Sequence, residues 1–175
     1  MAERIPVTVV NHVAIDVACA PDVVWAAILA EYVEARKFRE IGYAIDWLDE
    51  PAAFLGGYRL RFVQDGSVLD DRVCRVTELD AVARRLSMVA DYRSVPGGMT
   101  VHATYHAQAA GAGTRLAIDC HSGLGIEPPA DGSRAAVESA VATMTTQYAA
   151  ALADYLQGLK VRLESEPRND SLEKP

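Results

Sequence analysis

Cysteine, basic charge and long apolar runs are all scarce in this sequence. The three cysteines, Cys19, Cys74 and Cys120, are far apart and have no metal or redox spacing. Their number and spacing exclude a disulfide framework and are typical of buried thiols in a reducing compartment. The 17 basic residues against 24 acidic ones give a net charge of −7. Neither nucleic acid nor an anionic membrane surface is therefore expected as a partner.

The apolar content is high but evenly spread. No stretch approaches the ~20 apolar residues of a membrane span, and the first residues lack the apolar run of a signal peptide. We therefore expect a cytoplasmic protein without integral membrane association. A chain of 175 residues, 50% hydrophobic, is long enough for one domain with a core and a pocket. That domain is expected over residues 1–166, with a disordered polar tail over 167–175.

The stretch from Ser133 to about Glu166 is predicted to form one long amphipathic helix. Its apolar residues recur at spacings of three and four, which keeps one stripe of the helix apolar. Asp131 or Ser133 is suited to cap its N-terminus, after the break made by Pro128 and Pro129. The stripe consists of Val141, Met144, Tyr148, Leu152, Tyr155, Leu159 and Leu163.

Alternating apolar and polar residues predict strands over much of the remaining chain. Pro21 and the apolar residues after it indicate a short helix behind the first strand, and a second short helix is expected over 31–40. A curved antiparallel sheet packed on the long helix is the arrangement that buries both apolar faces, which makes the fold class α+β. The seven predicted strands cover residues 7–17, 43–48, 58–64, 69–79, 85–92, 99–108 and 115–121.

Two phrases resemble a known superfamily. The passage Ile15-Asp-Val-Ala-Cys-Ala-Pro-Asp-Val-Val-Trp25, taken with the terminal helix, resembles START/Bet v 1-like (SRPBCC) proteins, often labelled polyketide cyclase/dehydratase or lipid-transport-like, over residues 7–163. A weaker likeness lies in Val68-Leu-Asp-Asp-Arg-Val73, followed by Leu79-Asp80 and Arg85-Leu-Ser87. This stretch is similar to the "ERL…LDD…LS" stretch of the plant abscisic-acid receptor branch.

The resemblance implies a helix-grip fold, in which the sheet wraps the terminal helix around an internal cavity. Members of the superfamily bind hydrophobic or amphipathic ligands, and a minority catalyse cyclisation or dehydration. Because function resides in the cavity rather than in the fold, membership does not decide between these activities.

The alternation places all four histidines outside the predicted cavity, since the apolar side of each strand must face the helix. His102 and His106 are four residues apart, but in a strand this separates them by ~13 Å, too far to share a metal. His12 and His121 also fall among the outward polar residues. No metal and no cofactor is expected, and a histidine-based acid or nucleophile relay in the cavity is disfavoured.

Tyrosine dominates the polar residues that face inward. These tyrosines are either core residues with their hydroxyls tied to backbone, or a ligand wall with hydroxyl tips that orient a carbonyl or hydroxyl group. Tyr148, in the middle of the helix stripe, is expected to point into a pocket lined by Phe62, Tyr92 and Tyr105. The candidate ligand-binding residues are Tyr58, Phe62, Asp71, Tyr92, Tyr105, Met144 and Tyr148.

The pattern of the strand over 69–79 does not show which of its faces points inward, because both faces carry charged residues. Asp71 and Arg75 lie on one face, whereas Asp70, Arg72 and Glu78 lie on the other. The weaker resemblance favours Asp71 inside, where it would need Arg75 as a partner because a buried charge is costly alone. A solvated outer face for Asp71 is the alternative.

Two functions follow. The first is binding of a hydrophobic or amphipathic small molecule, of lipid, polyketide or aromatic type, by tyrosine hydroxyls without a paired acid and base. The second is a cofactor-independent cyclase or dehydratase, with Asp71 as the acid or base and a tyrosine polarising a carbonyl. No spacing demands the second, so binding is favoured. A self-association module without a ligand is less favoured, and a homodimer is left open.

Overall fold

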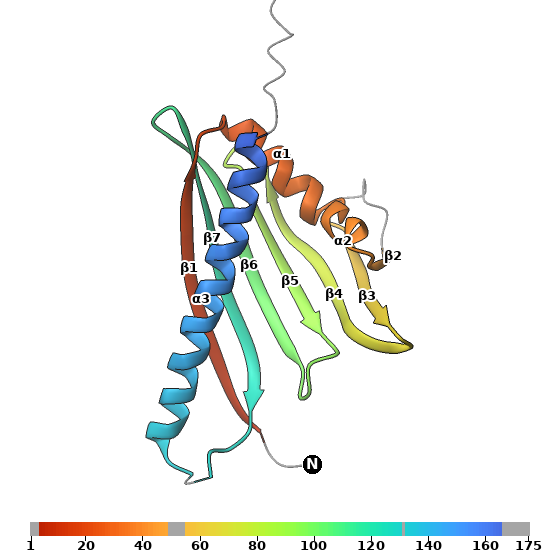
Figure 1. Ribbon diagram of the computed structural model, residues 1–175, viewed down its shortest axis with the longest axis vertical. Helices are drawn as coiled ribbons and strands as arrows, with labels where there is room; N and C mark the ends of the chain where they lie inside the picture. The colour runs from red at the N-terminus through yellow and green to blue at the C-terminus, as the bar shows by residue number, and fades with distance from the viewer. Residues whose placement is uncertain (1–3, 49–54, 131, 166–175) are drawn as a thin grey trace, which may run out of the picture.

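A single antiparallel sheet of seven strands forms the frame of the protein (Figure 1). The computed structural model describes residues 4–48, 55–130 and 132–165, and the tail predicted over 167–175 lies outside them. The predicted sheet, two short helices after the first strand and long terminal helix are confirmed. The elements are β1 Ile5–Val17, α1 Pro21–Tyr32, α2 Arg36–Glu40, β2 Ala44–Trp47, β3 Gly57–Gln64, β4 Ser67–Asp80, β5 Arg85–Tyr92, β6 Met99–Ala110, β7 Gly113–Ile126 and α3 Arg134–Ser165.

The strands follow one another across the sheet except for the first, giving the order β1-β7-β6-β5-β4-β3-β2. Short turns join β3 through β7, as the turn residues of the sequence predict. The turn after β3 has Asp65 and Gly66 at φ values of 51° and 76°, the left-handed pair that a two-residue hairpin favours. Because β1 pairs with β7, the first and last strands lie side by side at the edge next to α3.

Two irregularities in β4 bend the sheet and change which side chains face inward. The pairing with β3 shifts between Phe62 and Val63, and the pairing with β5 shifts between Val76 and Glu78, leaving Thr77 as an extra residue. A bulge of this kind reverses the alternation on either side of it. As a result, Arg72 and Glu78 do not share a face, although strict alternation places them together.

The boundary between the two short helices differs from the predicted one, which placed the second helix over 31–40. Helix α1 continues through Tyr32, and α2 is limited to Arg36–Glu40. Between them, Ala35 adopts φ 54°, a left-handed conformation that ends a right-handed helical path. Glu31 and Tyr32 at the end of α1 are buried, and α2 contributes Phe38 to the core.

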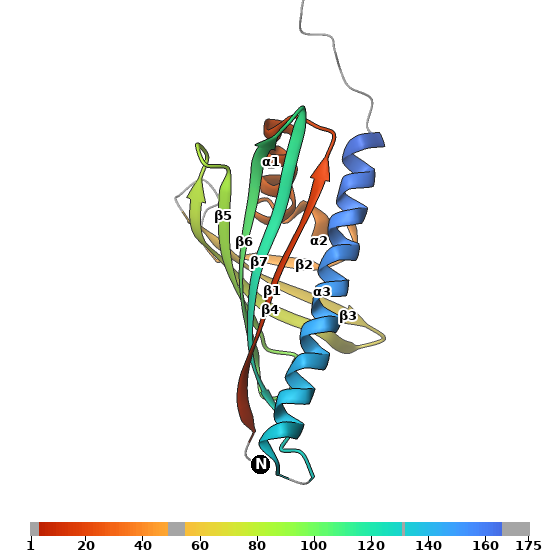
Figure 2. The same ribbon diagram turned by 90° about the vertical axis from the view of Figure 1, so that its left-hand side faces the viewer.

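Helix α3 runs along the β1 side of the sheet for most of the length of the strands (Figures 1 and 2). It begins after Ser133, whose hydroxyl accepts a hydrogen bond from the Ala136 amide at 3.1 Å. Its C-terminal half packs tightly, because Leu156, Leu159 and Leu163 are buried. The stripe residues of its first half are only half-buried, so the tight core lies at the α1 end of the sheet.

A buried carboxylate joins α1 to α3. Glu31 is 2% exposed, and the Tyr155 hydroxyl donates a 2.6 Å hydrogen bond to its Oε2. The guanidinium of Arg162 pairs with the other oxygen. These partners compensate for the loss of water around the charge, which would otherwise be strongly unfavourable in the core.

Arg162→Met should lower the free energy of unfolding by about 2–4 kcal/mol, because it leaves Glu31 buried without its cation. The double variant Glu31→Gln/Arg162→Met should recover part of that loss. Chemical denaturation measures both values. Arg134→Met, which removes an exposed partner of Glu138, is the control, and equal losses for Arg162→Met and Arg134→Met would contradict this account.

Candidate functional site

A cavity of about 420 Å³ lies between the inner face of the sheet, α3 and the two short helices. Its walls are mainly apolar and aromatic. Helix α3 contributes Tyr148, Ala151, Leu152 and Tyr155, and the inner faces of β6 and β7 contribute Met99, Val101, Ala103, Tyr105, Ile118, Cys120 and Ser122. The remaining wall comes from Tyr32, Lys37, Phe38, Ile41, Tyr43, Arg72 and Tyr92.

Stacked tyrosines form one side of the cavity. The rings of Tyr32 and Tyr105 lie 4.3 Å apart between centroids, and Tyr155 meets Tyr32 edge to face at 6.3 Å. Burial raises the pKa of Tyr32, Tyr105 and Tyr155. All three hydroxyls therefore stay protonated at neutral pH and can donate hydrogen bonds.

A charged cluster forms another part of the wall. Arg72 donates through Nη2 to Asp70 Oδ2 at 2.5 Å and through Nη1 to the Tyr92 hydroxyl at 2.6 Å. The Tyr43 hydroxyl donates to the same Asp70 oxygen at 2.8 Å. The Arg72 Nε and Asp70 Oδ1 atoms are buried without a hydrogen-bond partner, so the cluster is not fully satisfied.

Lys37 reaches the cavity from α2. Its Nζ lies 3.9 Å from the centroid of the Tyr155 ring and 5.4 Å from that of Tyr32, a favourable position for a cation over aromatic faces. Burial and the nearby Arg72 guanidinium lower the pKa of Lys37 to about 8. The amine is therefore mainly protonated at pH 7 but close to titration.

Three predicted site residues, Tyr92, Tyr105 and Tyr148, line this cavity together. Tyr58 is 1% exposed and donates a 2.6 Å hydrogen bond to the Tyr32 carbonyl. Tyr58 is thus a core residue with its hydroxyl tied to the backbone, the alternative to a place in the ligand wall. Phe62 packs on Tyr43 with ring centroids 5.2 Å apart. Neither Phe62 nor the half-buried Met144 is among the described residues that line the cavity.

The prediction that Asp71 faces the cavity is wrong, and the outer-face alternative holds. Arg59 binds both oxygens of Asp71, with Nε–Oδ1 at 2.8 Å and Nη2–Oδ2 at 2.6 Å. These hydrogen bonds hold the pKa of Asp71 below its usual range. The neighbour Arg72 faces inward instead, because adjacent strand residues point to opposite faces.

Sequence reasoning missed Lys37, Tyr32, Tyr43 and Arg72. A usable signal existed for Arg72, since it shares a phase with Cys74 and Val76, both of which are buried. Lys37 carried no such signal. It is one residue of a five-residue helix whose direction is set by the left-handed Ala35, and periodicity cannot orient a helix that short.

None of the four histidines lines the cavity. Asp119, on the outer face of β7, bridges two of them, with Oδ1–Nδ1 of His12 at 2.7 Å and Oδ2–Nε2 of His106 at 2.9 Å. Within the described ranges, no group of three or more His, Cys, Asp or Glu side chains is placed to hold a metal. Within those ranges, too, no helix combines the length and apolar character needed to cross a bilayer.

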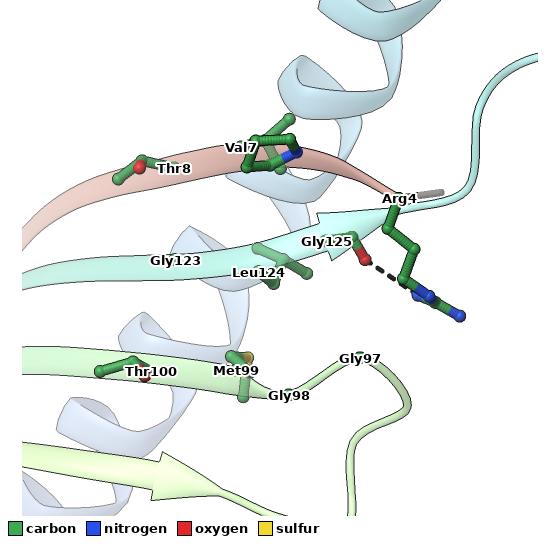
Figure 3. Close-up of a pocket in the computed structure, with 11 residues that line it drawn as sticks. Arg4, Val7, Thr8, Gly97, Gly98, Met99, Thr100, Gly123, Leu124 and Gly125 are labelled. Carbon is green, nitrogen blue, oxygen red and sulfur yellow. Dashed lines mark hydrogen bonds between the residues drawn. The ribbon is translucent and has the colours of Figure 1, made fainter. Parts of the chain in front are cut away.

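A second hollow, of about 580 Å³, lies at one end of β1, β7 and β6 (Figure 3). It exists because Gly97, Gly98, Gly123 and Gly125 carry no side chains there. Arg4 lies along its rim, donating to the Gly125 carbonyl at 2.9 Å (Figure 3). Although larger, this hollow offers few side-chain groups for binding, and the tyrosine-lined cavity combines apolar walls with convergent polar groups.

No family model and no curated protein matches the sequence. Solved structures match in fold, including an uncharacterised protein from Rhizobium leguminosarum, with a TM-score of 0.60 at 12% identity over 94% of this chain and 100% of that one. Ara h 8.0201 matches at TM-score 0.54 and 10% identity, covering 87% and 99% of the two chains. Norcoclaurine synthase from Thalictrum flavum, solved in complex with dopamine and hydroxybenzaldehyde, matches at 0.53 and 15%, covering 81% and 88%.

These structures are members of the Bet v 1-like (SRPBCC) fold. The predicted helix-grip architecture is therefore confirmed, and at such identities the likeness concerns the fold alone.

The bridge on the outer face predicts a pH dependence of stability. Hydrogen bonds from His12 and His106 lower the pKa of Asp119 in the folded protein. The stability that this pair of contacts contributes is thus present above the unfolded pKa, about 3.9, and is lost as pH falls through the lowered folded pKa. Asp119→Asn should therefore show a shallower loss of unfolding free energy between about pH 4 and pH 2.

Denaturation curves across that pH range measure the effect, with Asp65→Asn in the β3–β4 turn as the control. If the Asp119 and Asp65 variants have the same acid slope as the unaltered protein, the bridge contributes nothing to acid sensitivity.

Proposed function

We propose that the protein binds a hydrophobic or amphipathic small molecule, of lipid, polyketide or aromatic type, in the tyrosine-lined cavity. The observation that carries the proposal is the composition of the walls. Apolar side chains such as Val101, Ala103 and Leu152, together with tyrosine rings, surround a space of about 420 Å³, and Lys37 and Arg72 are its charged groups among the described residues. Cavities of this size and lining are typical of small-molecule sites.

Tyr148 is the hydroxyl that best fits a ligand contact. It lies on the half-buried part of α3 and lines the cavity. Among the described residues, its hydroxyl has no hydrogen-bond partner, unlike Tyr58 and Tyr155, whose hydroxyls bind the Tyr32 carbonyl and Glu31. A ligand oxygen can therefore accept a hydrogen bond from Tyr148 without displacing a contact within the protein.

The fold supports the proposal in general terms. Norcoclaurine synthase, a neighbour in fold, holds dopamine and hydroxybenzaldehyde. A chain of the same architecture can thus accommodate small aromatic molecules.

The alternative, a cofactor-independent cyclase or dehydratase, is weaker. Its acid or base was Asp71, which is bound by Arg59 on the outer face of the sheet. Asp70, which contacts the cavity-lining residues Arg72 and Tyr43, accepts hydrogen bonds from both. Binding requires no such group and therefore remains the favoured function.

We also propose a cytoplasmic location and a homodimer. Free thiols at Cys19, Cys74 and Cys120 support a reducing cytoplasm. The exposed apolar side chains Val68 and Leu69, on the hairpin of β3 and β4, are compatible with the homodimer that the sequence leaves open.

Fluorescence titration with N-phenyl-1-naphthylamine, an uncharged apolar probe, tests the function. The probe should bind saturably with increased emission. Ala151→Trp, which fills the cavity from α3, should weaken binding by roughly tenfold or more, because a bulky ring then occupies the probe's space. Ala150→Trp is the matched control, because Ala150 is exposed like Ala151 but is not among the residues that line the cavity. Unsaturable binding, or equal binding to the two tryptophan variants, would refute the proposal.

Tyr148→Phe should separate a ligand contact from ordinary packing. In competition with the same probe, binding of 2-acetylnaphthalene should weaken by about 0.5–1.5 kcal/mol, the net value of one hydrogen bond. Binding of 2-ethylnaphthalene, which lacks the oxygen, should not change. The melting temperature should also stay nearly constant. A fall in melting temperature with both affinities intact would place Tyr148 in the core and outside the site.

A further inference from the structure

The cavity holds two cations that face the same space. Lys37 Nζ lies 5.7 Å from the centroid of the Phe38 ring, and Arg72 Cζ lies 5.3 Å from that centroid. Both side chains line the cavity, one from α2 and the other from β4. The Arg72 charge acts on Lys37 across this space, because like charges repel one another in surroundings of low polarity.

Among the described residues, only one carboxylate offsets these charges. Asp70 pairs with Arg72, and Lys37 has no salt bridge with any described residue. Glu31, a buried acid of α1, forms an ion pair with Arg162 and accepts a hydrogen bond from Tyr155. Counted over the described residues, the cavity therefore carries one positive charge in excess, unlike the protein as a whole, whose net charge is −7.

The unsatisfied donors point to the same conclusion, whereas the unpaired acceptor Asp70 Oδ1 would take a hydrogen bond from water or from a ligand hydroxyl. Arg72 Nε is buried without a partner, and the Lys37 ammonium contacts aromatic rings in place of an acceptor oxygen. Native structures rarely leave buried donors unpaired unless a ligand or water completes them. An oxyanion accepts several hydrogen bonds and supplies the missing negative charge.

We propose that the ligand of this cavity is an organic anion, an apolar body bearing a carboxylate or another oxyanion, whose charged group lies between Lys37 and Arg72. The apolar body then lies along Val101, Ala103 and Leu152. The inference rests on the proposed binding function and narrows its ligand class.

The lowered pKa of Lys37 agrees with this geometry. Its causes are burial and the neighbouring Arg72, and no carboxylate counters them. A bound anion raises the pKa of Lys37, so the protonated amine and the anion stabilise one another. Anion affinity should consequently fall as pH rises through about 8, when Lys37 loses its proton.

The other titratable groups around Lys37 do not produce the same response. Arg72 remains charged throughout. The tyrosines that line the cavity and have raised pKa values stay neutral through this range, because burial displaces their titration upward; they are Tyr32, Tyr43, Tyr92, Tyr105 and Tyr155. Burial likewise raises the pKa of Cys120, so its thiol stays neutral near pH 8.

A matched pair of probes isolates the charge. 8-Anilinonaphthalene-1-sulfonate has the skeleton of N-phenyl-1-naphthylamine with one added sulfonate. Lys37→Met should weaken the sulfonate probe by roughly tenfold, the loss of one charge-assisted contact, and leave the uncharged probe within about twofold. Arg36→Met removes the same charge from the exposed side of the same helix and should change neither affinity.

The unaltered protein provides a test that needs no variant. Its affinity for the sulfonate probe should decline between about pH 7 and pH 9.5, whereas that for the uncharged probe should not. Lys37→Met should abolish this decline, and Lys37→Arg should hold the affinity at its low-pH level.

Equal pH and variant responses of the two probes would overturn the anion inference while leaving cavity binding intact. A Lys37→Met variant that loses only thermal stability, with both probes unaffected, would assign Lys37 to packing on Tyr155 and would overturn it as well. Absence of saturable binding by the uncharged probe would instead refute the underlying function.

Discussion

A sheet of seven strands is wider than the single long helix that lies on it. Strands ~4.8 Å apart make a sheet roughly 29 Å across, whereas a helix with its side chains is ~10–12 Å wide. Helix α3 covers the β1 side, and α1 and α2 cover one end of the rest (Figure 1). The inner face between them must be filled by large side chains or left as a cavity. Here both occur, since the core is tight around Leu156 and Ile28 and opens beside Tyr148.

The charged residues in and near the cavity differ in how well neighbouring groups compensate their charges. Arg72 sits among Tyr43, Tyr92 and Asp70, which replace much of the water that burial removes. In the described part of the chain, the partners of Lys37 are aromatic faces, which stabilise a cation less than a carboxylate does. Glu31 shows the contrasting case, because its two partners satisfy it fully within the protein. The uncompensated charge of Lys37 is the basis of the anionic ligand class that we propose.

The sequence predicted most of the fold, because periodicity reports directly on which face of an element is buried. The stripe on α3 and the alternation of β6 placed Tyr148 and Tyr105 on facing surfaces. The same reasoning failed in β4, where charged residues occupy both faces and the bulge at Thr77 changes the phase. It also failed for α2, whose orientation depends on the left-handed backbone at Ala35. The charged residues that line the described cavity, Arg72 and Lys37, lie in these two segments. The phase of Arg72 with Cys74 and Val76 could have oriented it, whereas no pattern could orient Lys37.

The nature of the molecule that occupies the cavity tests the account most directly. Native mass spectrometry of the protein purified from its own host, followed by release and identification of any bound compound, makes that measurement. The account predicts one small molecule per chain with an apolar body and an anionic oxygen group. A bound compound that is neutral or cationic would contradict the charge argument, and a cavity that stays empty in the presence of the host's small molecules would contradict the binding function itself.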